Sequence, residues 1–369
     1  YAHSKSAGLL ILATFLIILL ASIIVPNFPI EYYWVWMNTT YWIPCYLITA
    51  LWLGFSLEHI IKRFPTAHGV HYALVLLVVL SPLLTHFKHN DQSDYYFSRD
   101  YAQNLLDTMD EDAIYFGSGD HTIFPVTYLQ IVEGQRPDLT LANMYGYISP
   151  ELYADMPADL RATMPRLPRT MHDPIIFNWI LENTDRPVYT TRLRSSKSRT
   201  PVQHGLLYAD LPEGATPPLS SDTVWDTYTW HTLDPADTHG DWTAEIIGYE
   251  YRLARARYLL QQGNTMEALA LIEEAKRLVH GNKESLYNLG LVLAKSGLFQ
   301  EAISLFGQAC EEDPIYAAAH YNLARCYLKL ESPEKALKHS NLLVHHYPDN
   351  PTFAQLHKKI LQGQKTSQD

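Results

Sequence analysis

The sequence predicts a multi-domain chain in which transmembrane α-helices are followed by a mixed α/β domain and then by an all-α repeat solenoid. Three observations predict this class. Apolar runs without charge are concentrated in the first 87 residues. Short apolar runs bounded by turn residues alternate with segments of helical period over 94–247. A pattern of small residues then recurs with the period of a helical repeat. We therefore predict domains at 1–93, 94–247 and 248–369.

The composition excludes several classes of protein. The net charge of -11 argues against nucleic acid as a partner, because phosphate binding needs clustered Lys and Arg, and no Lys/Arg block occurs. With three cysteines, the chain has neither a disulfide framework nor a CxxC metal pattern. Cys310 and Cys326 fall on neighbouring repeat helices. The sequence therefore leaves open whether they are free thiols or form a disulfide with each other.

The N-terminal apolar runs have the length of membrane spans. Residues 7–25 contain no charged side chain, and as a helix they would extend about 28 Å, close to the ~30 Å hydrocarbon core of a bilayer. Two further runs, at about 41–60 and 70–87, complete three predicted transmembrane helices. Buried helices of a soluble core are the alternative, and the length of the first run argues against them. The predicted partner of this domain is the lipid bilayer.

Basic residues in the short loops predict an orientation. Lys5 precedes the first span, and Lys62 and Arg63 lie between the second and third, whereas the loop between the first two holds no Lys or Arg. Because cytoplasmic loops carry the excess of basic residues, we expect residues 88–369 to be extracytoplasmic. The chain begins with Tyr1 directly before an apolar run, which we interpret as a truncated membrane protein.

The region after the predicted spans has the pattern of an α/β domain. Apolar residues at helical spacing are followed by short buried strands that end at glycine or proline. One strand–helix–strand passage forms a βαβ-like unit. The predicted elements are a helix at 99–109, a strand at 113–116, a helix ending near 132, and strands at 139–144, 185–191 and 204–211.

The turn that follows the first strand is a candidate ligand site. A strand-to-helix turn presents free N–H groups at the positive end of a helix, and Gly117, Gly119 and Asp120 lie there. The turn matches neither GxGxxG nor a P-loop, so nucleotide binding is the weaker interpretation. The alternative is structural: the glycines adopt positive φ, and Asp120 caps the helix.

The C-terminal part of the sequence repeats itself with a period of about 34 residues, the length of a tetratricopeptide repeat. Gly290 and Ala302 stand where two helices of such a repeat would cross closely, and Phe306 is one of the larger residues at the seam. The predicted units are 249–282, 283–316 and 317–350, followed by a capping helix at 351–363.

Three stretches of the α/β region also match a known family in order and spacing. They are RDYA with Asn104 (from Arg99 and Asp100), the turn with Gly119, Asp120, Phe124 and Pro125, and YLQIVEGQRPD (128–138), which contains Arg136. These motifs resemble a bacterial integral-membrane family once described only as a domain of unknown function. That family is now grouped with the vertebrate transmembrane O-mannosyltransferases of the GT-C glycosyltransferase superfamily. Ser118, Thr122 and Ile123 depart from its pattern, which puts any ligand of those positions in doubt.

The resemblance, which covers roughly residues 1–210, implies an enzyme of the inner membrane of a bacterium. Such an enzyme passes a hexose, for example mannose, from a polyprenyl-phosphate-sugar donor to an extracytoplasmic protein. The family places its catalytic acid in an outward loop upstream of this chain, so no catalytic residue, metal ligand or cofactor is assigned here. Within this chain, the candidate ligand or turn residues are Arg99, Asp100, Gly119, Asp120 and Arg136.

Two functions therefore stay open. In the first, the chain is the C-terminal part of a membrane glycosyltransferase, and this portion binds the protein acceptor or another partner. In the second, the chain is a membrane-anchored tetratricopeptide scaffold without catalysis. Both predict a protein or peptide partner in the concave groove of the repeats. The alternative for the repeats is that they only pack against the α/β domain. Whether the chain is an enzyme is not decided by the sequence.

Overall fold

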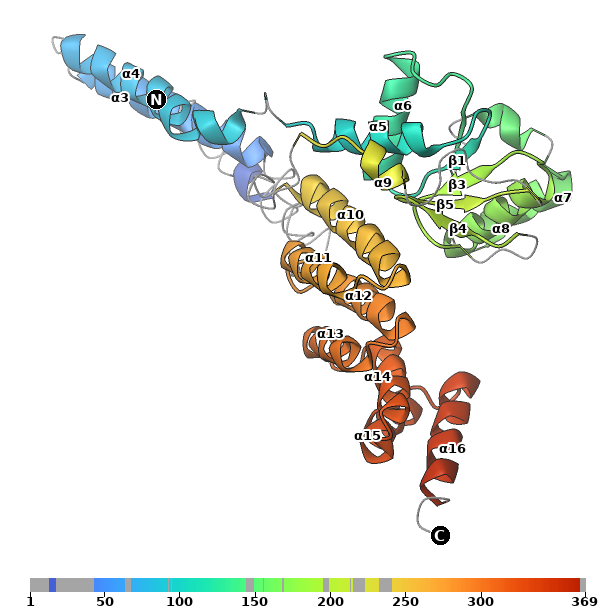
Figure 1. Ribbon diagram of the computed structural model, residues 1–369. Helices are drawn as coiled ribbons and strands as arrows, with labels where there is room; N and C mark the ends of the chain where they lie inside the picture. Colours follow the sequence, from blue (N-terminus) through green and yellow to red (C-terminus); the bar gives the residue numbers. More distant parts are fainter. Residues whose placement is uncertain are drawn as a thin grey trace. The chain divides into compact units, whose positions relative to one another are not determined.

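The computed structural model of the chain consists of two compact units, Tyr1–Tyr95 and Tyr96–Asp369 (Figure 1). The described part of the first unit is mainly two long helices, and the second unit contains a five-stranded sheet and a stack of helices. The structure describes residues 13–17, 43–63, 68–91, 93, 95–143, 149–154, 156–167, 169–194, 199–212, 214, 223–231 and 241–365.

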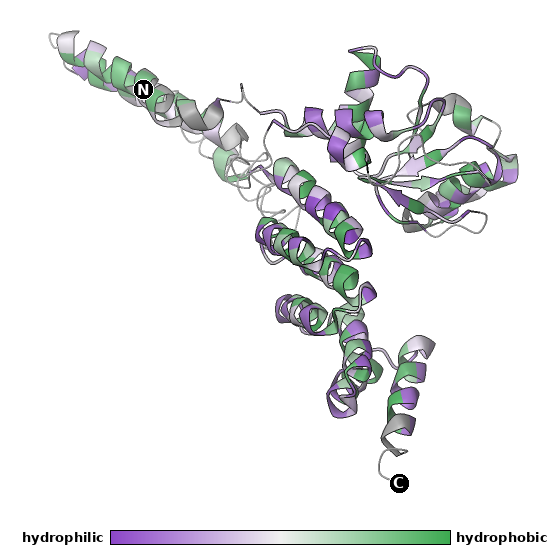
Figure 2. Cartoon of the chain, in the orientation of Figure 1, coloured by the Kyte–Doolittle hydropathy of each residue, from purple (hydrophilic) through white to green (hydrophobic). Residues whose placement is uncertain are grey.

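Helices α3 (Ile43–Arg63) and α4 (His68–Asn90) are the long helices of the first unit, and apolar residues predominate along both (Figure 2). Polar residues nevertheless limit the apolar length of each helix. Glu58 pairs with Lys62 at 2.6 Å near the end of α3, and α4 opens on two histidines. Over the described residues, no helix combines the length and the hydropathy needed to cross a lipid bilayer.

This finding contradicts the predicted transmembrane class of the N-terminal domain. The spans predicted at 41–60 and 70–87 are wrong, because neither helix that forms there has the length and apolar character that a membrane span requires over the described residues. The inner-membrane location and the extracytoplasmic placement of 88–369 are wrong with them, and the lipid bilayer has no support as a partner. The first predicted span, 7–25, lies outside the described residues except for 13–17.

The second unit contains a mixed sheet with strand order β2-β1-β3-β5-β4. Its first three strands are parallel, and α6 (Asp120–Ile131) connects β1 to β2, as the βαβ pattern predicts. The last two strands continue the sheet in antiparallel pairing. The strands are β1 (Ile114–Phe116), β2 (Thr140–Ala142), β3 (Val188–Thr190), β4 (Val202–His204) and β5 (Leu207–Asp210).

Gly205 makes the turn between the two antiparallel strands. Its φ is 58°, a left-handed conformation that glycine adopts without strain. A Cβ at this position would lie 1.9 Å from the Tyr228 hydroxyl, which accepts a hydrogen bond from the Leu206 amide at 2.9 Å. The stretch predicted as one strand, 204–211, is therefore the end of β4, a turn and β5.

Helices cover both faces of the sheet (Figure 1). Because side chains alternate along a strand, Tyr115 and Tyr189 join one core, whereas Ile114 and Val188 join the other. The first face carries α5 (Phe97–Thr108), α6 and α9 (Val224–Thr227). The second face carries α8 (Arg169–Glu182) and packs against residues of η2 (Pro150–Tyr153), α7 (Ala158–Thr163) and η3 (Met164–Arg166).

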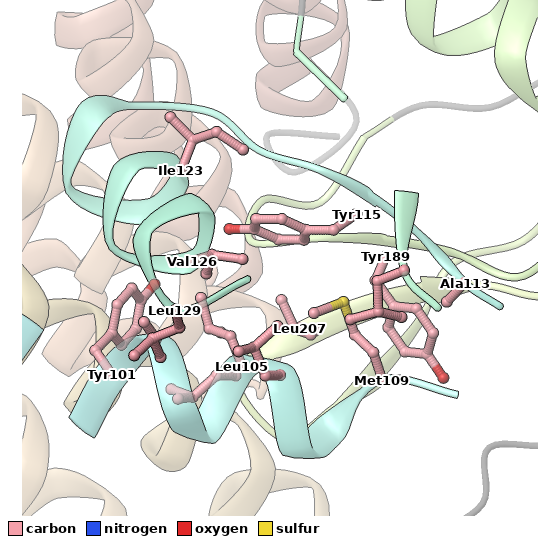
Figure 3. Close-up of a cluster of buried hydrophobic side chains, with 14 of the residues drawn as sticks. Tyr101, Leu105, Met109, Ala113, Tyr115, Ile123, Val126, Leu129, Tyr189 and Leu207 are labelled. Carbon is pink, nitrogen blue, oxygen red and sulfur yellow. The ribbon is translucent and has the colours of Figure 1, made fainter. Parts of the chain in front are cut away.

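The core of the first face joins α5, α6 and the strands (Figure 3). In this close-up, Leu105 of α5 and Val126 of α6 lie near Tyr115 of the central strand. All three are fully buried, and burial of each aliphatic side chain contributes about 1.5–3 kcal/mol to folding. At the edge of this core, the Tyr189 hydroxyl donates to Asp110 at 2.9 Å, so the strand β3 is tied to the residues that follow α5.

The C-terminal helices form antiparallel pairs, and each helix carries both polar and apolar residues (Figure 2). Each pair is joined by a short turn, and Gly263 and Gly297 occupy equivalent turn positions with φ of 80° and 82°. Glycine is favoured after a helix because it adopts this left-handed conformation freely. The helices are α10 (Trp242–Gln261), α11 (Thr265–Leu278), α12 (Lys283–Lys295), α13 (Phe299–Glu312), α14 (Ala317–Lys329), α15 (Pro333–His346) and α16 (Pro351–Lys365).

Small residues lie where the paired helices cross, as the sequence predicts. Ala268, Ala302 and Ala336 occupy the same position in successive repeats, and each is 0% exposed. At Gly290, a Cβ would lie 2.7 Å from the Phe306 ring. Helix α12 therefore approaches α13 closely because position 290 carries no side chain.

Helix α10 belongs to both cores of the second unit. Its Ile247 and Ala254 pack in the core of the sheet, whereas Tyr249 and Leu259 pack in the core of the repeats. The sheet and the repeats are thus joined through shared packing on one helix. In the repeat core, Cys310 and Cys326 are free thiols, so the disulfide left open by the sequence does not form.

Candidate functional site in the groove of the repeats

The repeats contain a cavity of about 920 Å³ between α12, α14 and α16. These are alternate helices of the stack, which we call the inner helices of the array, and the first residue of the intervening α13, Phe299, also lines the cavity. We call this cavity the groove. Its lining residues are Leu291, Ala294, Lys295, Phe299, Tyr321, Asn322, Arg325, Cys326, Leu328, Lys329, Thr352, Gln355, Leu356 and Lys359.

Apolar side chains form the floor of the groove. Leu291, Tyr321 and Leu328 are half-buried and present part of their surface to the cavity. The packing behind them is closed, since Leu293 and Leu323 are 1% and 3% exposed. An apolar floor on a rigid backing is the usual form of a binding cleft, because little has to reorganise when a ligand enters.

Basic side chains form the rim of the groove. Lys295, Arg325, Lys329 and Lys359 line it and are exposed, and no carboxylate lines it. In the described part of the chain, no ion pair joins these four residues to an acidic residue. Arg325 lies 5.5 Å from the centre of the Tyr321 ring, which holds the guanidinium beside the apolar floor.

Asn322 links two of the helices that form the groove. Its side-chain amide donates to the Tyr287 hydroxyl of α12 at 3.1 Å and to the Ala318 carbonyl at 3.1 Å. Its side-chain oxygen accepts from Arg325 at 3.4 Å. Asn322 is buried, so these bonds position α14, Tyr287 and Arg325 relative to one another.

A pair of histidines lies behind the groove. His320 Nδ1 and His339 Nδ1 are 2.9 Å apart, and His320 Nε2 lies 3.0 Å from the Pro314 carbonyl, to which it donates. Burial lowers the pKa of His339 to about 4 and raises the pKa of the adjacent Cys310 thiol to about 11. Both groups are therefore neutral near pH 7. Among the described residues, no group of three or more His, Cys, Asp or Glu is arranged to hold a metal.

The candidate residues at the start of α5 are engaged in separate contacts. Arg99 donates to both oxygens of Glu133, at 2.8 and 3.1 Å, on the surface. Asp100 is buried and accepts from the backbone and the ring Nδ1 of His231, at 2.8 and 2.9 Å. Tyr96 stacks on the His231 ring with centroids 4.3 Å apart. Asp100 thus joins α5 to a segment 131 residues away.

The candidate turn before α6 agrees in part with the structural alternative, since Gly119 has positive φ but Asp120 is not the cap. Gly119 is the N-cap of α6, with φ of 95°, and it makes no side-chain cap. Asp120 is the first residue of the helix and is exposed. Its carboxylate interacts favourably with the positive end of the helix dipole but does not cap the helix. The neighbouring His121 Nε2 lies 3.2 Å from Glu250 of α10. The turn is therefore tied to the repeats through His121.

Arg136 closes the C-terminal end of α5. Its guanidinium donates to the carbonyls of Leu106, Met109 and Asp110 at 2.6 to 3.0 Å, and to Asp138 at 2.8 Å. Hydrogen bonding from Arg136 lowers the pKa of Asp138 to about 2. Arg99 lies at the opposite, N-terminal end of α5 and pairs with Glu133, so the five candidate residues do not converge on one point. The ligand role predicted for them stays a prediction.

Sequence analysis missed Glu250 of α10. Glu250 accepts from the Tyr101 hydroxyl at 2.8 Å and faces His121. Burial acts to raise the pKa of Glu250, but the hydrogen bonds from His121 and Tyr101 bring it below its ordinary value. No local pattern signals this contact, because its three members lie on helices that are far apart in sequence.

Asp210 is a buried charge at the end of β5. It is 0% exposed, and in the described part of the chain neither carboxylate oxygen has a hydrogen-bond partner. Burial raises its pKa to about 6, although Arg199 and Arg194 oppose this effect. The folded state therefore binds a proton at Asp210 more tightly than the unfolded state does.

We expect Asp210→Asn to stabilise the protein in alkaline solution. Because the folded pKa is raised, the stability gained from protonated Asp210 is present below pH 3.8 and is lost as pH rises through about 6. The variant should gain about 1–3 kcal/mol in free energy of unfolding at pH 8 and little at pH 4. Urea unfolding at both pH values measures this, with the exposed Asp226→Asn as control. Equal gains at the two pH values would contradict it.

Comparison with known proteins supports the two-part description of the second unit. Residues 253–314 and 293–360 each match a tetratricopeptide repeat family model. Residues 98–168 match a model described as TMEM260-associated domain 2. The tetratricopeptide prediction is confirmed, and such repeats indicate binding of a protein partner. None of the three models is one of a GT-C glycosyltransferase.

Two curated relatives are similar to part of the chain. A TPR repeat-containing thioredoxin, TTL4, from Arabidopsis thaliana is 40% identical over 96 residues, which are 26% of this chain and 14% of that protein. A DnaJ homolog subfamily C member 3 homolog from Dictyostelium discoideum is 32% identical over 143 residues, 37% of this chain and 28% of that protein. The chain thus spans less than a third of either relative.

Proposed function

We propose that the repeats bind a segment of a partner protein in the groove between α12, α14 and α16. The observation that carries this proposal is the open cavity of about 920 Å³ with an apolar floor and basic rim. If the repeats served only to pack against the sheet, we would expect the sheet to cover this cavity. The cavity instead lies toward the end of the repeats that is far from the shared helix α10. The function is therefore protein–protein interaction.

The groove is built to accept a chain segment without refolding. Its helices are held by the cores of the repeats, with Leu289, Ala302, Phe306 and Ala324 all 0% exposed. Preformed sites bind more tightly for a given contact area because less conformational entropy is lost. Half-buried Phe299 and Tyr321 are the aromatic side chains that line it, and aromatic residues contribute most strongly to such contacts.

The test begins with a random peptide library displayed on phage and selected on the full chain. Selected peptides are synthesised with a fluorophore, and their affinity is measured by anisotropy. Gln355 is exposed and lines the groove, so Gln355→Trp should fill it and weaken binding at least about tenfold. Ala354→Trp, on the same helix but outside the lining, is the matched control and should keep wild-type affinity.

Two results would overturn the proposal. In the first, no peptide is enriched on the chain over a bare surface. In the second, peptides are enriched but bind Gln355→Trp as tightly as wild type, which would place their site elsewhere. Circular dichroism of both tryptophan variants shows whether the helices are retained.

A second candidate is that the bound segment is the acceptor of a glycosyltransferase to which this chain belongs. It is supported by the match of residues 98–168 to TMEM260-associated domain 2, which overlaps the stretch that resembles the O-mannosyltransferase family. The sugar donor, a polyprenyl-phosphate hexose, rests on that resemblance alone. O-linked transfer needs a hydroxyl, so this candidate requires Ser or Thr in the selected peptides. Peptides without either would contradict it.

A further inference from the structure

The basic residues of the groove recur with the period of the repeats. Lys295 and Lys329 are one repeat apart, and so are Arg325 and Lys359. Lys295 is the last residue of α12, and Lys329 is the last residue of α14. Each pair therefore occupies equivalent positions on consecutive inner helices. The cations form two rows along the groove.

These rows stand out against the charge of the rest of the protein. The chain carries a net charge of -11, yet the groove is lined by four cations and no carboxylate. A concave surface lined by one sign of charge concentrates the field and attracts ligands of the opposite sign. In the described part of the chain, no ion pair with an acidic residue involves the lysines of the two rows.

We infer that the occupant of the groove is an acidic protein segment, whose carboxylates pair with the two rows while its apolar side chains meet Leu291, Tyr321 and Leu328. This inference rests on the function proposed above.

The rim cations act mainly on specificity and on the rate of association. Exposed charges are screened by salt, because the Debye length falls from ~30 Å at ~0.01 M to ~8 Å at ~0.15 M. Binding of the acidic segment should therefore weaken as salt rises. The apolar floor responds to salt in the opposite direction or not at all, so salt dependence separates the two contributions.

The experiment compares the sequences selected by the wild-type chain and by a charge-reversed variant. Peptides selected on wild type should be enriched in Asp and Glu, and their affinity should fall roughly tenfold or more on the double variant Lys295→Glu, Lys329→Glu. The control is Lys338→Glu, Lys358→Glu, which makes the same change of net charge at exposed positions outside the lining. The control should retain most of the affinity and its salt dependence.

The outcomes distinguish this inference from the proposed function. Peptides that lose affinity on Gln355→Trp but are neutral, insensitive to salt and unaffected by Lys295→Glu, Lys329→Glu would overturn the acidic partner and leave the groove as a site. Equal loss on the control variant would show a general charge effect and would also overturn it. An unlabelled single-stranded oligonucleotide that competes through the same residues as strongly as the peptide would replace the protein segment with nucleic acid.

Discussion

Replacing Phe306 with Ala is expected to lower the free energy of unfolding of the second unit by about 3–5 kcal/mol. Phe306 is 0% exposed, its ring packs against Gly290 on α12, and its centroid lies 5.6 Å from that of Tyr287. Removal of the ring leaves a cavity between α12 and α13 that glycine at position 290 cannot fill. Tyr287 also accepts the hydrogen bond from Asn322, so the groove should lose order with the packing.

Urea unfolding followed by circular dichroism measures the effect of Phe306→Ala. The matched control is Met266→Ala in the same array, where the side chain is 86% exposed and the expected change is below about 0.5 kcal/mol. A midpoint for Phe306→Ala equal to that of the control would show that the two helices are not packed through this ring. It would remove the physical basis of the groove.

Replacing Arg136 with Met is expected to cost about 2–3 kcal/mol, because three carbonyls at the end of α5 lose a charged donor. Methionine keeps much of the length and apolar character of the stem, so the loss reports the hydrogen bonds. The pKa of Asp138 should rise from about 2 toward its ordinary value, since Arg136 is the main cause of its lowering. Peptide binding in the groove should not change.

Arg99→Met is the control for Arg136→Met. Both arginines belong to the motifs that resemble a known family, but Arg99 makes a surface ion pair with Glu133 and should contribute less than about 1 kcal/mol. Thermal unfolding and the carboxyl chemical shift of Asp138 give the two readouts. If both variants lost equal stability and the pKa of Asp138 stayed low, Arg136 would not close α5.

The repeats were the part of the fold most open to prediction. Their period is visible directly in the sequence, and its small members, such as Ala302 and Ala336, are the ones that the helix crossing buries. The βαβ passage was also predictable because buried parallel strands are continuous apolar runs. The helix α8 was not predicted, and β4 was predicted only at its last residue, His204. Pro174 lies inside α8, and β4 is a three-residue strand without a clear alternation.

The N-terminal prediction failed because apolar content in a window was taken as a membrane span. The helices α3 and α4 that form over 43–63 and 68–90 also include the charged and polar turns at their ends.

The contacts of the candidate residues could not be predicted. Asp100 meets His231 across 131 residues, and Arg136 meets the end of α5, because tertiary packing brings these segments together. The groove residues carried a signal that could have been found: Lys295 and Lys329 share the repeat period, as do Arg325 and Lys359. Which face of the repeats carries them is known only once the helices are placed.

The most direct measurement is a crystal structure of the full chain bound to a selected peptide. We predict that the peptide lies along α12, α14 and α16, with an apolar side chain against Leu291 or Tyr321 and carboxylates within hydrogen-bonding distance of Lys295 and Lys329. A peptide seated on the outer helices α13 and α15, or on the sheet, would contradict the assignment of the groove as the binding site.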